Sequence, residues 1–193
     1  MTAAASTQTE SNLATAAQRG DPRAYGELVT RHRAGVVSVV YHMCGDSRLA
    51  EEAAQEAFLR AWQRLAGYRP EQPFRAWIYR IAINAALDAL RRERRLVSLE
   101  DLLAGDSDET YPAESSDGPE ETVEANQRAE KVHRAVLALP PASRSVLVLR
   151  EYSGLSYSEI AGALEIPLGT VMSRLNSARS QLRQALAGIL EEI

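Results

Sequence analysis

Cysteine, aromatic residues and lysine are scarce in this chain. Cys44 is the single cysteine among 193 residues, which excludes an internal disulfide and a zinc site built from several cysteines. The simplest compartment for such a chain is a reducing one, so we expect a cytoplasmic protein. Aromatic residues make up only 6% of the sequence, whereas Ala and Leu are abundant, and this balance predicts an all-α fold.

Long apolar runs and targeting signals are missing as well. No run approaches the roughly 18 residues of a membrane span, so we expect no membrane insertion. The N-terminus has no cation before Arg19 and no apolar centre, so we expect no signal peptide, and we expect residues 1–10 to be disordered. With 45% hydrophobic residues, the chain can bury one core or two small ones.

The sequence contains no residue pattern that is typical of a catalytic site. His32, His42 and His133 have no acid or nucleophile at an informative spacing, and we expect His32 and His42 at the surface or boundary of helices. Cys44 is predicted to be a packed thiol, and no glycine-rich phosphate loop is present. We therefore predict a protein that is not an enzyme and that uses no cofactor and no metal.

The net charge of −4 hides a segmented pattern. Residues 1–95 hold 14 Arg and 10 acidic residues (net +4), and residues 131–193 hold 7 cations and 5 acidic residues (net +2). Between them, residues 96–130 hold one Arg and 11 acidic residues (net −10). Of the 22 cations, 21 are Arg, which suits forked contacts to phosphates and bases, although GC-rich coding would produce the same excess.

Helical spacing and capping signals divide the chain into two helical units. We expect helices at 12–19, from Pro22 (capped by Asp21) to Cys44 with a stop at Gly45, from 47 to 65, and from Phe74 to about Arg95. The inner face of the 47–65 helix is predicted to hold Ala50, Ala54, Phe58, Ala61, Trp62 and Leu65. Residues 96–119, rich in acids, Gly, Ser and Pro, are predicted to be a flexible linker.

The second unit begins near Glu120 and ends in a helical hairpin. Helices are expected to Leu139, over 142–152, from the capping box Ser156–Glu159, and from Thr170 to about Leu190 after the turn at 167–169. Val171, Leu175 and Ala178 would face inward, while Thr170, Ser173, Arg174, Ser177 and Arg179 would face outward. Any helical hairpin could show this spacing, so periodicity alone leaves DNA binding open, and an outward Met172 is unexpected for a groove reader.

Two further surfaces have both an ordinary and a functional interpretation. Glu52, Gln55, Glu56 and Leu59 form one stripe, either a solvated acidic face or a docking face for a basic helix. Tyr68, Phe74, Trp77 and Tyr79 alternate with Arg69, Arg75 and Arg80, and Arg91, Arg92, Arg94 and Arg95 follow. This mixture suits single-stranded nucleic acid, but core rings and a helix-dipole effect would explain part of it.

Three of these stretches together resemble the extracytoplasmic-function (group IV) type of bacterial RNA polymerase sigma factor. "LAEEAAQEAFLRAW" is similar to the polymerase-binding helix, and "FRAWIYRIAINAALDALRR" to the promoter-melting helix. "LSYSEIAGALEIPLGTVMSRLNSAR" is similar to the C-terminal helix-turn-helix. The resemblance covers residues 12–95 and 120–188 and implies a region 2-like domain at 12–95, the linker at 96–119 and a region 4-like domain at 120–188.

The resemblance also implies partners and site residues. Core RNA polymerase would be bound by Glu52, Gln55, Glu56 and Leu59. The chain would bind promoter DNA both as a duplex and as a single-stranded non-template strand. The residues that melt the promoter and bind the minus-ten element would be Tyr68, Arg69, Arg75, Trp77, Arg80, Asn84, Asp88, Arg91 and Arg92. The loop at 67–73 would receive a flipped base. The minus-thirty-five element would be read by Thr170, Ser173, Arg174, Ser177 and Arg179, and an anti-sigma factor silences many members.

Some features depart from the family or leave alternatives open. Members often carry cations where this chain has Met172 and Ser177, so the minus-thirty-five sequence does not transfer from relatives. The acidic linker would thread the polymerase cleft until nascent RNA displaces it, or it is a plain spacer. The alternatives to a stress-responsive sigma factor are a stand-alone helix-turn-helix regulator and a helical adaptor that binds only proteins.

Overall fold

The computed structural model describes residues 2–104 and 120–187, and within these ranges all regular secondary structure is helical, which confirms the predicted all-α fold. Among the described residues, no helix has both the length and the apolar character that crossing a bilayer requires. In chain order the elements are α1 (Thr2–Gln18), α2 (Pro22–Cys44), α3 (Ser47–Arg64), a 3-10 turn (Leu65–Gly67), α4 (Phe74–Ala104), α5 (Glu120–Ala138), α6 (Pro141–Glu151), α7 (Tyr157–Leu164) and α8 (Leu168–Ala185).

The helix ends follow the capping residues of the sequence. The Asp21 carboxylate accepts hydrogen bonds from the backbone N–H groups of Arg23 (2.9 Å) and Ala24 (3.3 Å), which satisfies free donors at the start of α2. Ser156 and Glu159 form the predicted capping box at the start of α7. These local interactions confirm the predicted starts of both helices.

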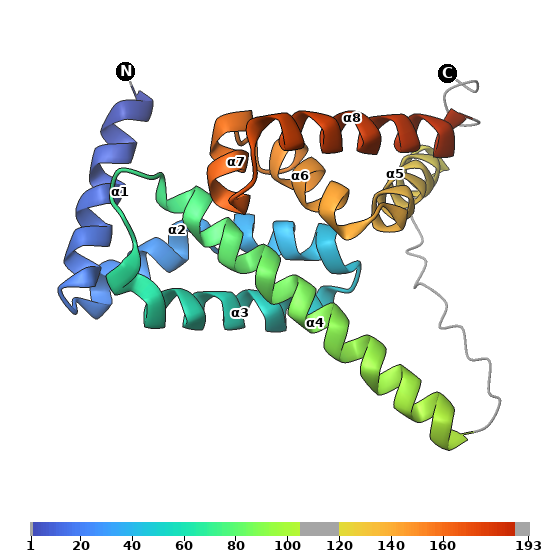
Figure 1. Ribbon diagram of the computed structural model, residues 1–193, viewed down its shortest axis with the longest axis horizontal. Helices are drawn as coiled ribbons and strands as arrows, with labels where there is room; N and C mark the ends of the chain where they lie inside the picture. Colours follow the sequence, from blue (N-terminus) through green and yellow to red (C-terminus); the bar gives the residue numbers. More distant parts are fainter. Residues whose placement is uncertain (1, 105–119, 188–193) are drawn as a thin grey trace.

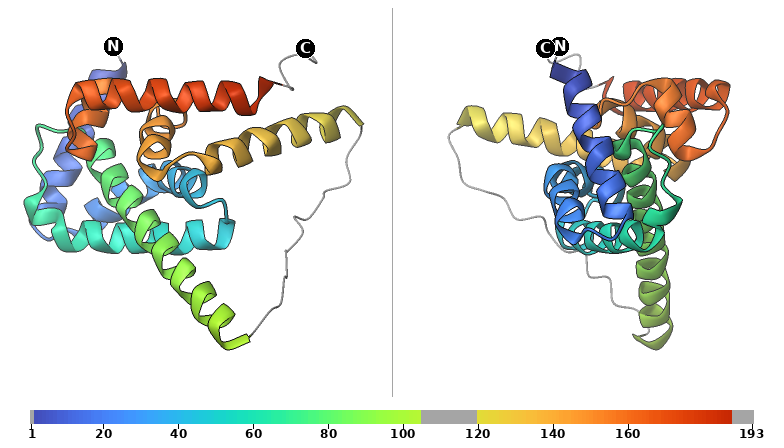
Figure 2. Two further views of the ribbon diagram at one scale, coloured as in Figure 1. Left: turned by 45° about the vertical axis from the view of Figure 1, so that its right-hand side comes forward. Right: turned by 90° about the vertical axis from the view of Figure 1, so that its left-hand side faces the viewer.

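Helices α1–α4 form the first unit, and α5–α8 form the second (Figure 1). In the first unit the small buried side chains of α3 let it lie close to α2 and α4: Ala50, Ala53, Ala54, Ala57 and Ala61. In the second unit α6 is central, because every residue from Ser143 to Leu149 is buried. The last turns of α4 stand clear of both units in all views (Figure 2).

Two predicted boundaries were wrong. Helix α1 begins at Thr2, although residues 1–10 were expected to be disordered. Its docked end, at Ala14 and Ala17, provides a nucleus from which a helix can propagate through residues such as Ala at little cost. Helix α4 continues through 96–104, the first part of the predicted linker, because no glycine or proline interrupts it before Gly105. Residues 105–119 and the predicted end of the last helix near Leu190 lie outside the described residues.

The prediction that Trp62 lies on the inner face of α3 was also wrong. Its side chain is 39% exposed, and its ring packs against Tyr25 at a centroid distance of 4.8 Å. The buried face of α3 is centred on its alanines and Phe58, and Trp62 falls at the edge of that face. Large rings at such an edge bury one side and leave the other in water.

Replacing Gly45 with alanine is expected to destabilise the fold by about 1–2 kcal/mol. Gly45 ends α2 with a left-handed φ of 83°, which disfavours any residue with a Cβ. A Cβ there would also lie 2.5 Å from Leu137 Cδ1 of α5, so that side chain would have to move. Gly26→Ala in the same helix is the matched control. No atom lies within 4 Å of its added Cβ, so urea denaturation should find it neutral or about 0.5–1 kcal/mol more stable. Equal effects of the two substitutions would contradict this account.

Candidate nucleic-acid interface

The acidic stripe of α3 lies on the face of the helix opposite its buried alanines. Glu52 and Gln55 are exposed, Glu56 is half-buried, and Leu59 is 53% exposed. Glu52 pairs with Arg48 at 2.9 Å, a contact within the same helix and open to solvent. An exposed leucine beside exposed carboxylates makes this stripe both apolar and anionic, as a docking face for a basic helix requires.

Asp88 of α4, which is predicted to take part in promoter melting, also pairs with an arginine of α3. Its carboxylate accepts a hydrogen bond from Arg60 of α3 at 2.7 Å, and Arg60 also pairs with Glu56 at 2.8 Å. The hydrogen bond that Arg60 donates to Asp88, followed by the one that it donates to Glu56, raises the pKa of Arg60. Asp88 therefore joins α4 to α3, and its contact with promoter DNA stays a prediction.

Most of the aromatic rings near the start of α4 pack against one another. Tyr68 is only 4% exposed, contacts Phe74 and Trp77 at centroid distances of 5.4 and 5.1 Å, and donates a hydrogen bond to the Gln72 carbonyl at 2.6 Å. Phe74 is fully buried, and Trp77 is half-buried. Tyr68 therefore shapes the 67–73 loop from inside, and Trp77 is the ring at this place that retains an accessible side.

The polar side chains predicted on α4 fall into two groups. Arg69 in the preceding loop and Asn84, Arg91 and Arg92 on the helix are exposed. Arg75 and Arg80 are instead engaged by the second unit: Arg75 pairs with Glu159 at 2.8 Å, and Arg80 pairs with Glu165. Sequence spacing gave no indication of these two pairs, because their members lie more than 80 positions apart.

The ion pair between Arg75 and Glu159 is supported by the capping box of α7. Burial disfavours the charged form of Glu159, but hydrogen bonds from Arg75 and from Ser156 outweigh burial and lower the pKa of its carboxyl group. Glu159 thus serves two purposes, since it caps α7 and holds α4 against it.

The hairpin of α7 and α8 has the predicted inner face, with Val171, Leu175 and Ala178 buried. Of the five residues predicted to read DNA, Ser173 and Ser177 are exposed, whereas Thr170, Arg174 and Arg179 are half-buried. Arg179 pairs with Glu151 of α6 at 2.7 Å, and Ser177 contacts the Gln181 side chain at 3.0 Å. Met172 is 45% exposed, as expected for an outward position.

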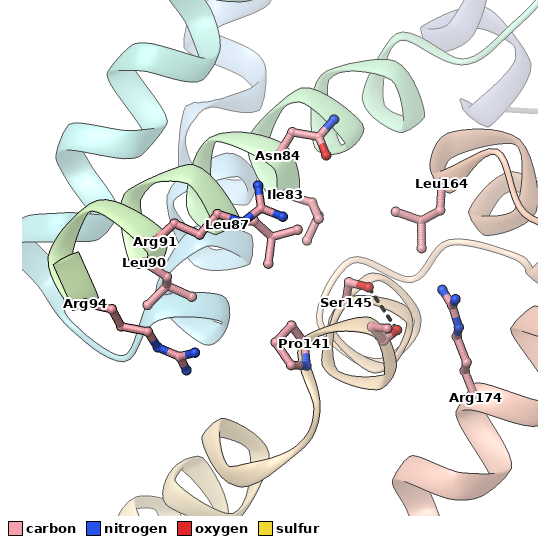
Figure 3. Close-up of a pocket in the computed structure, with 11 residues that line it drawn as sticks. Ile83, Asn84, Leu87, Leu90, Arg91, Arg94, Pro141, Ser145, Leu164 and Arg174 are labelled. Carbon is pink, nitrogen blue, oxygen red and sulfur yellow. Dashed lines mark hydrogen bonds between the residues drawn. The ribbon is translucent and has the colours of Figure 1, made fainter.

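A cavity of about 400 Å³ separates the two surfaces that were expected to meet DNA (Figure 3). Ile83, Asn84, Leu87, Arg91 and Arg94 of α4 line one side, and Leu164 of α7 and Arg174 of α8 line the other. Figure 3 shows the Arg174 guanidinium directed toward this space. In this arrangement the candidate DNA contacts of the two units face each other across one cavity.

The most deeply placed cation was missed by the sequence analysis. Arg144 of α6 is 7% exposed and donates to the Met43 carbonyl at the end of α2 at 2.6 Å, to the Leu139 carbonyl at 3.0 Å, and to the Leu137 carbonyl. Burial lowers its pKa. Nearby, burial raises the pKa of Cys44 to about 12, which agrees with the predicted packed thiol. No pattern in the sequence marked Arg144, because its partners are backbone carbonyls.

Family models match both units of the chain. The model described as "Sigma-70 region 2" matches residues 28–96, within α2–α4, and the model described as "Sigma-70, region 4" matches residues 129–182, within α5–α8. The chain is 34% identical to the RNA polymerase sigma-H factor of Pseudomonas aeruginosa over 178 residues, which cover 91% of this chain and 92% of that protein. It is 33% identical to the ECF RNA polymerase sigma factor SigW of Bacillus subtilis over 172 residues, covering 88% and 92%.

Solved structures with a similar fold agree with these matches. A structure titled as CnrH in complex with the cytosolic domain of CnrY superposes with a TM-score of 0.70 at 26% identity, covering 93% of this chain and 98% of that one. The sigma factor RpoE of Bartonella quintana, solved with the anti-sigma factor NepR, superposes with a TM-score of 0.64 at 20% identity, covering 84% and 96%. The latter likeness extends to the fold alone.

Proposed function

The chain belongs to the extracytoplasmic-function sigma factors of the sigma-70 family, and on that premise we propose that it binds core RNA polymerase and directs promoter-specific initiation of transcription. The observation that carries the proposal is the agreement between the family matches and the surfaces. The region 2 match contains the exposed stripe of α3 and the exposed cations of α4, and the region 4 match contains the α7–α8 hairpin.

In this proposal the unit at residues 12–95 docks on polymerase and opens the minus-ten element. Glu52, Gln55, Glu56 and Leu59 bind the polymerase, and the exposed Asn84, Arg91 and Arg92 bind the separated non-template strand. The loop at 67–73 receives a flipped base, and its contacts offset the few kcal/mol that unstacking costs. The accessible side of Trp77 supports a stacking role for that ring, while the burial of Tyr68 supports a role in shaping the loop.

The unit at residues 120–188 reads the minus-thirty-five element with Thr170, Ser173, Arg174, Ser177 and Arg179. Two modest DNA-binding units joined in one chain gain effective concentration once polymerase holds them in register. An anti-sigma partner is also proposed, because the relative CnrH was solved with the cytosolic domain of a second protein, CnrY. The stand-alone regulator has no comparable support, since it leaves the region 2 match without a purpose.

In vitro transcription with core polymerase tests the proposal. Core enzyme mixed with the full chain should initiate at discrete promoter positions, which sequencing of the 5′ ends of transcripts will identify. The control reactions contain core enzyme alone, or holoenzyme saturated with another sigma factor. A chain that leaves core enzyme unspecific, and changes transcription only when holoenzyme is supplied, would be a regulator and would refute the proposal.

Leu59→Ala is expected to weaken binding to core polymerase about tenfold. Leu59 is 53% exposed in the free chain, so its truncation removes mainly apolar area that docking would bury, at about 1–2 kcal/mol. Leu168→Ala is the matched control, because Leu168 is similarly exposed (46%) but lies on α8. Fluorescence titration of labelled chain with core enzyme should detect the loss for Leu59 alone. Equal affinities of the Leu59 variant and wild type for core enzyme would show that this face of α3 does not bind polymerase.

A further inference from the structure

The two units contact each other through α4 and the α7–α8 hairpin. The proposed function requires these two surfaces to be separated, because each would bind a different promoter element. Arg75 and Arg80 of α4 pair with Glu159 and Glu165 at the two ends of α7, and Arg174 faces the cavity shared with α4. Elements named minus ten and minus thirty-five lie about 25 base pairs apart, or roughly 85 Å at ~3.4 Å per base pair. Surfaces that touch each other cannot occupy both elements, so the chain must open before it binds a promoter.

A cluster of four rings joins the units on the side of α2. His42, in the last turn of α2, stacks on Tyr152 at the end of α6 with a centroid distance of 3.6 Å. Tyr41 stacks on His133 of α5 at 4.6 Å with an interplanar angle of 7°, and the two imidazoles meet edge to face at 5.5 Å. The ring cluster, defined by Tyr41, His42, His133 and Tyr152, therefore takes two rings from each unit.

We propose that the ring cluster is an acid-sensitive latch: it holds the two units closed while its imidazoles are neutral, and it releases them when the imidazoles gain protons. The consequence for transcription rests on the proposed function, but the latch itself does not. Its chemistry is that of two buried neutral imidazoles in edge-to-face contact, which repel each other once both carry charge.

The surroundings of the imidazoles favour the neutral form. His42 Nδ1 and both ring nitrogens of His133 are buried and have no hydrogen-bond partner among the described residues, so a proton added at these three atoms would find no acceptor. Glu130 of α5 favours a proton on His133, whereas Arg144 of α6 disfavours it. The other titratable groups here are Tyr41, Tyr152 with its neighbour Glu151, and, around Arg144, Cys44 and Arg94.

Burial, aided by His133, lowers the pKa of His42 to about 4, and burial likewise lowers the pKa of His133. In an open chain both would titrate near 6.5. The closed form therefore binds fewer protons, its advantage is complete above the open-chain pKa, and that advantage is lost as the pH falls toward 4. For His42 alone, the ratio of closed to open molecules should fall about tenfold between pH 7.5 and 5.5.

Small-angle X-ray scattering of the full chain between pH 7.5 and 5.5 tests the latch without polymerase or DNA. The radius of gyration of wild type should rise as the pH falls, while far-UV circular dichroism stays constant because each unit remains helical. The variant His42→Phe/His133→Phe keeps rings in place but cannot gain protons, and it should stay compact at pH 5.5. His32→Gln is the matched control, since His32 pairs with Glu10 inside the first unit at 2.6 Å, and it should open like wild type.

Two results would overturn the latch: a wild-type radius that does not change with pH, or a phenylalanine variant that opens as wild type does. If the double variant does not fold, His42→Phe alone provides the same comparison. Scattering measures only the size of the free chain and involves no polymerase or DNA. A failure here therefore leaves the transcription proposal intact. A chain inactive with core polymerase would likewise leave the latch result intact.

Discussion

Arg144→Met will be among the most destabilising single substitutions in this chain, with an expected loss of about 3–5 kcal/mol. Arg144 is buried, and its guanidinium donates to the carbonyls of Met43, Leu137 and Leu139. Methionine keeps much of the length of the side chain but donates nothing, so these carbonyls lose a charged donor within the protein interior. An unsatisfied buried polar group costs about 1–3 kcal/mol, and more than one is created here.

Arg150→Met is the matched control for this substitution. Arg150 lies on the same helix, is half-buried, donates to the single carbonyl of Leu155 at 2.9 Å and lies over the Tyr157 ring at 5.1 Å. We expect its replacement to cost about 1–2 kcal/mol. Urea denaturation followed by circular dichroism will compare the two, and scattering will report whether the Arg144 variant is also expanded, because the Met43 carbonyl belongs to the other unit. Equal losses would mean that burial of the carbonyls does not matter.

Local features of the fold could be predicted from the sequence because they depend on neighbours in the chain. The Asp21 cap, the Gly45 stop and the Ser156–Glu159 capping box each join residues within four positions, and all three were predicted. The inward face of α8 followed from helical spacing in the same way. The acidic composition after Arg95 predicted a linker, but the absence of a helix breaker before Gly105 lets α4 continue through 96–104.

Contacts between the units could not be predicted, since helical spacing marks a face as polar without identifying what lies against it. Arg75 and Arg80 looked like free cations, yet each meets a carboxylate of α7. Arg144 and the Met43 carbonyl are 101 positions apart, and a backbone carbonyl has no signature in the sequence. Asp88 matched a family motif, and helical spacing gave no sign that its carboxylate also pairs with Arg60 of α3.

These contacts change how the predicted melting residues should be tested. Trp77→Ala would remove a ring that packs against Tyr68 and Phe74 in the core, so lost activity could reflect a lost fold. Arg75 and Arg80 are unsuitable as well, because replacing them would also loosen the contact between the units. Arg91 and Arg92 are exposed on α4. The ion pair of Arg91 with Asp88, at 3.3 Å, lies within that helix and is open to solvent.

The double variant Arg91→Ala/Arg92→Ala is expected to slow formation of the open promoter complex at least about 30-fold while leaving stability unchanged. Two contacts to the separated strand, each contributing about 1 kcal/mol or more, are lost together. Arg31→Ala/Arg33→Ala is the matched control, since it removes the same charge from exposed positions on α2.

Permanganate footprinting of unpaired thymines will measure strand opening on duplex promoter DNA and on DNA with a mismatched minus-ten element. If Arg91 and Arg92 act when the strands separate, the mismatched template should restore most of the lost rate, because its unpairing no longer depends on the protein. A deficit of the same size on both templates would mean that the two arginines hold duplex DNA instead. If the double variant opened duplex DNA at the wild-type rate, Arg91 and Arg92 would not belong to the promoter-melting surface.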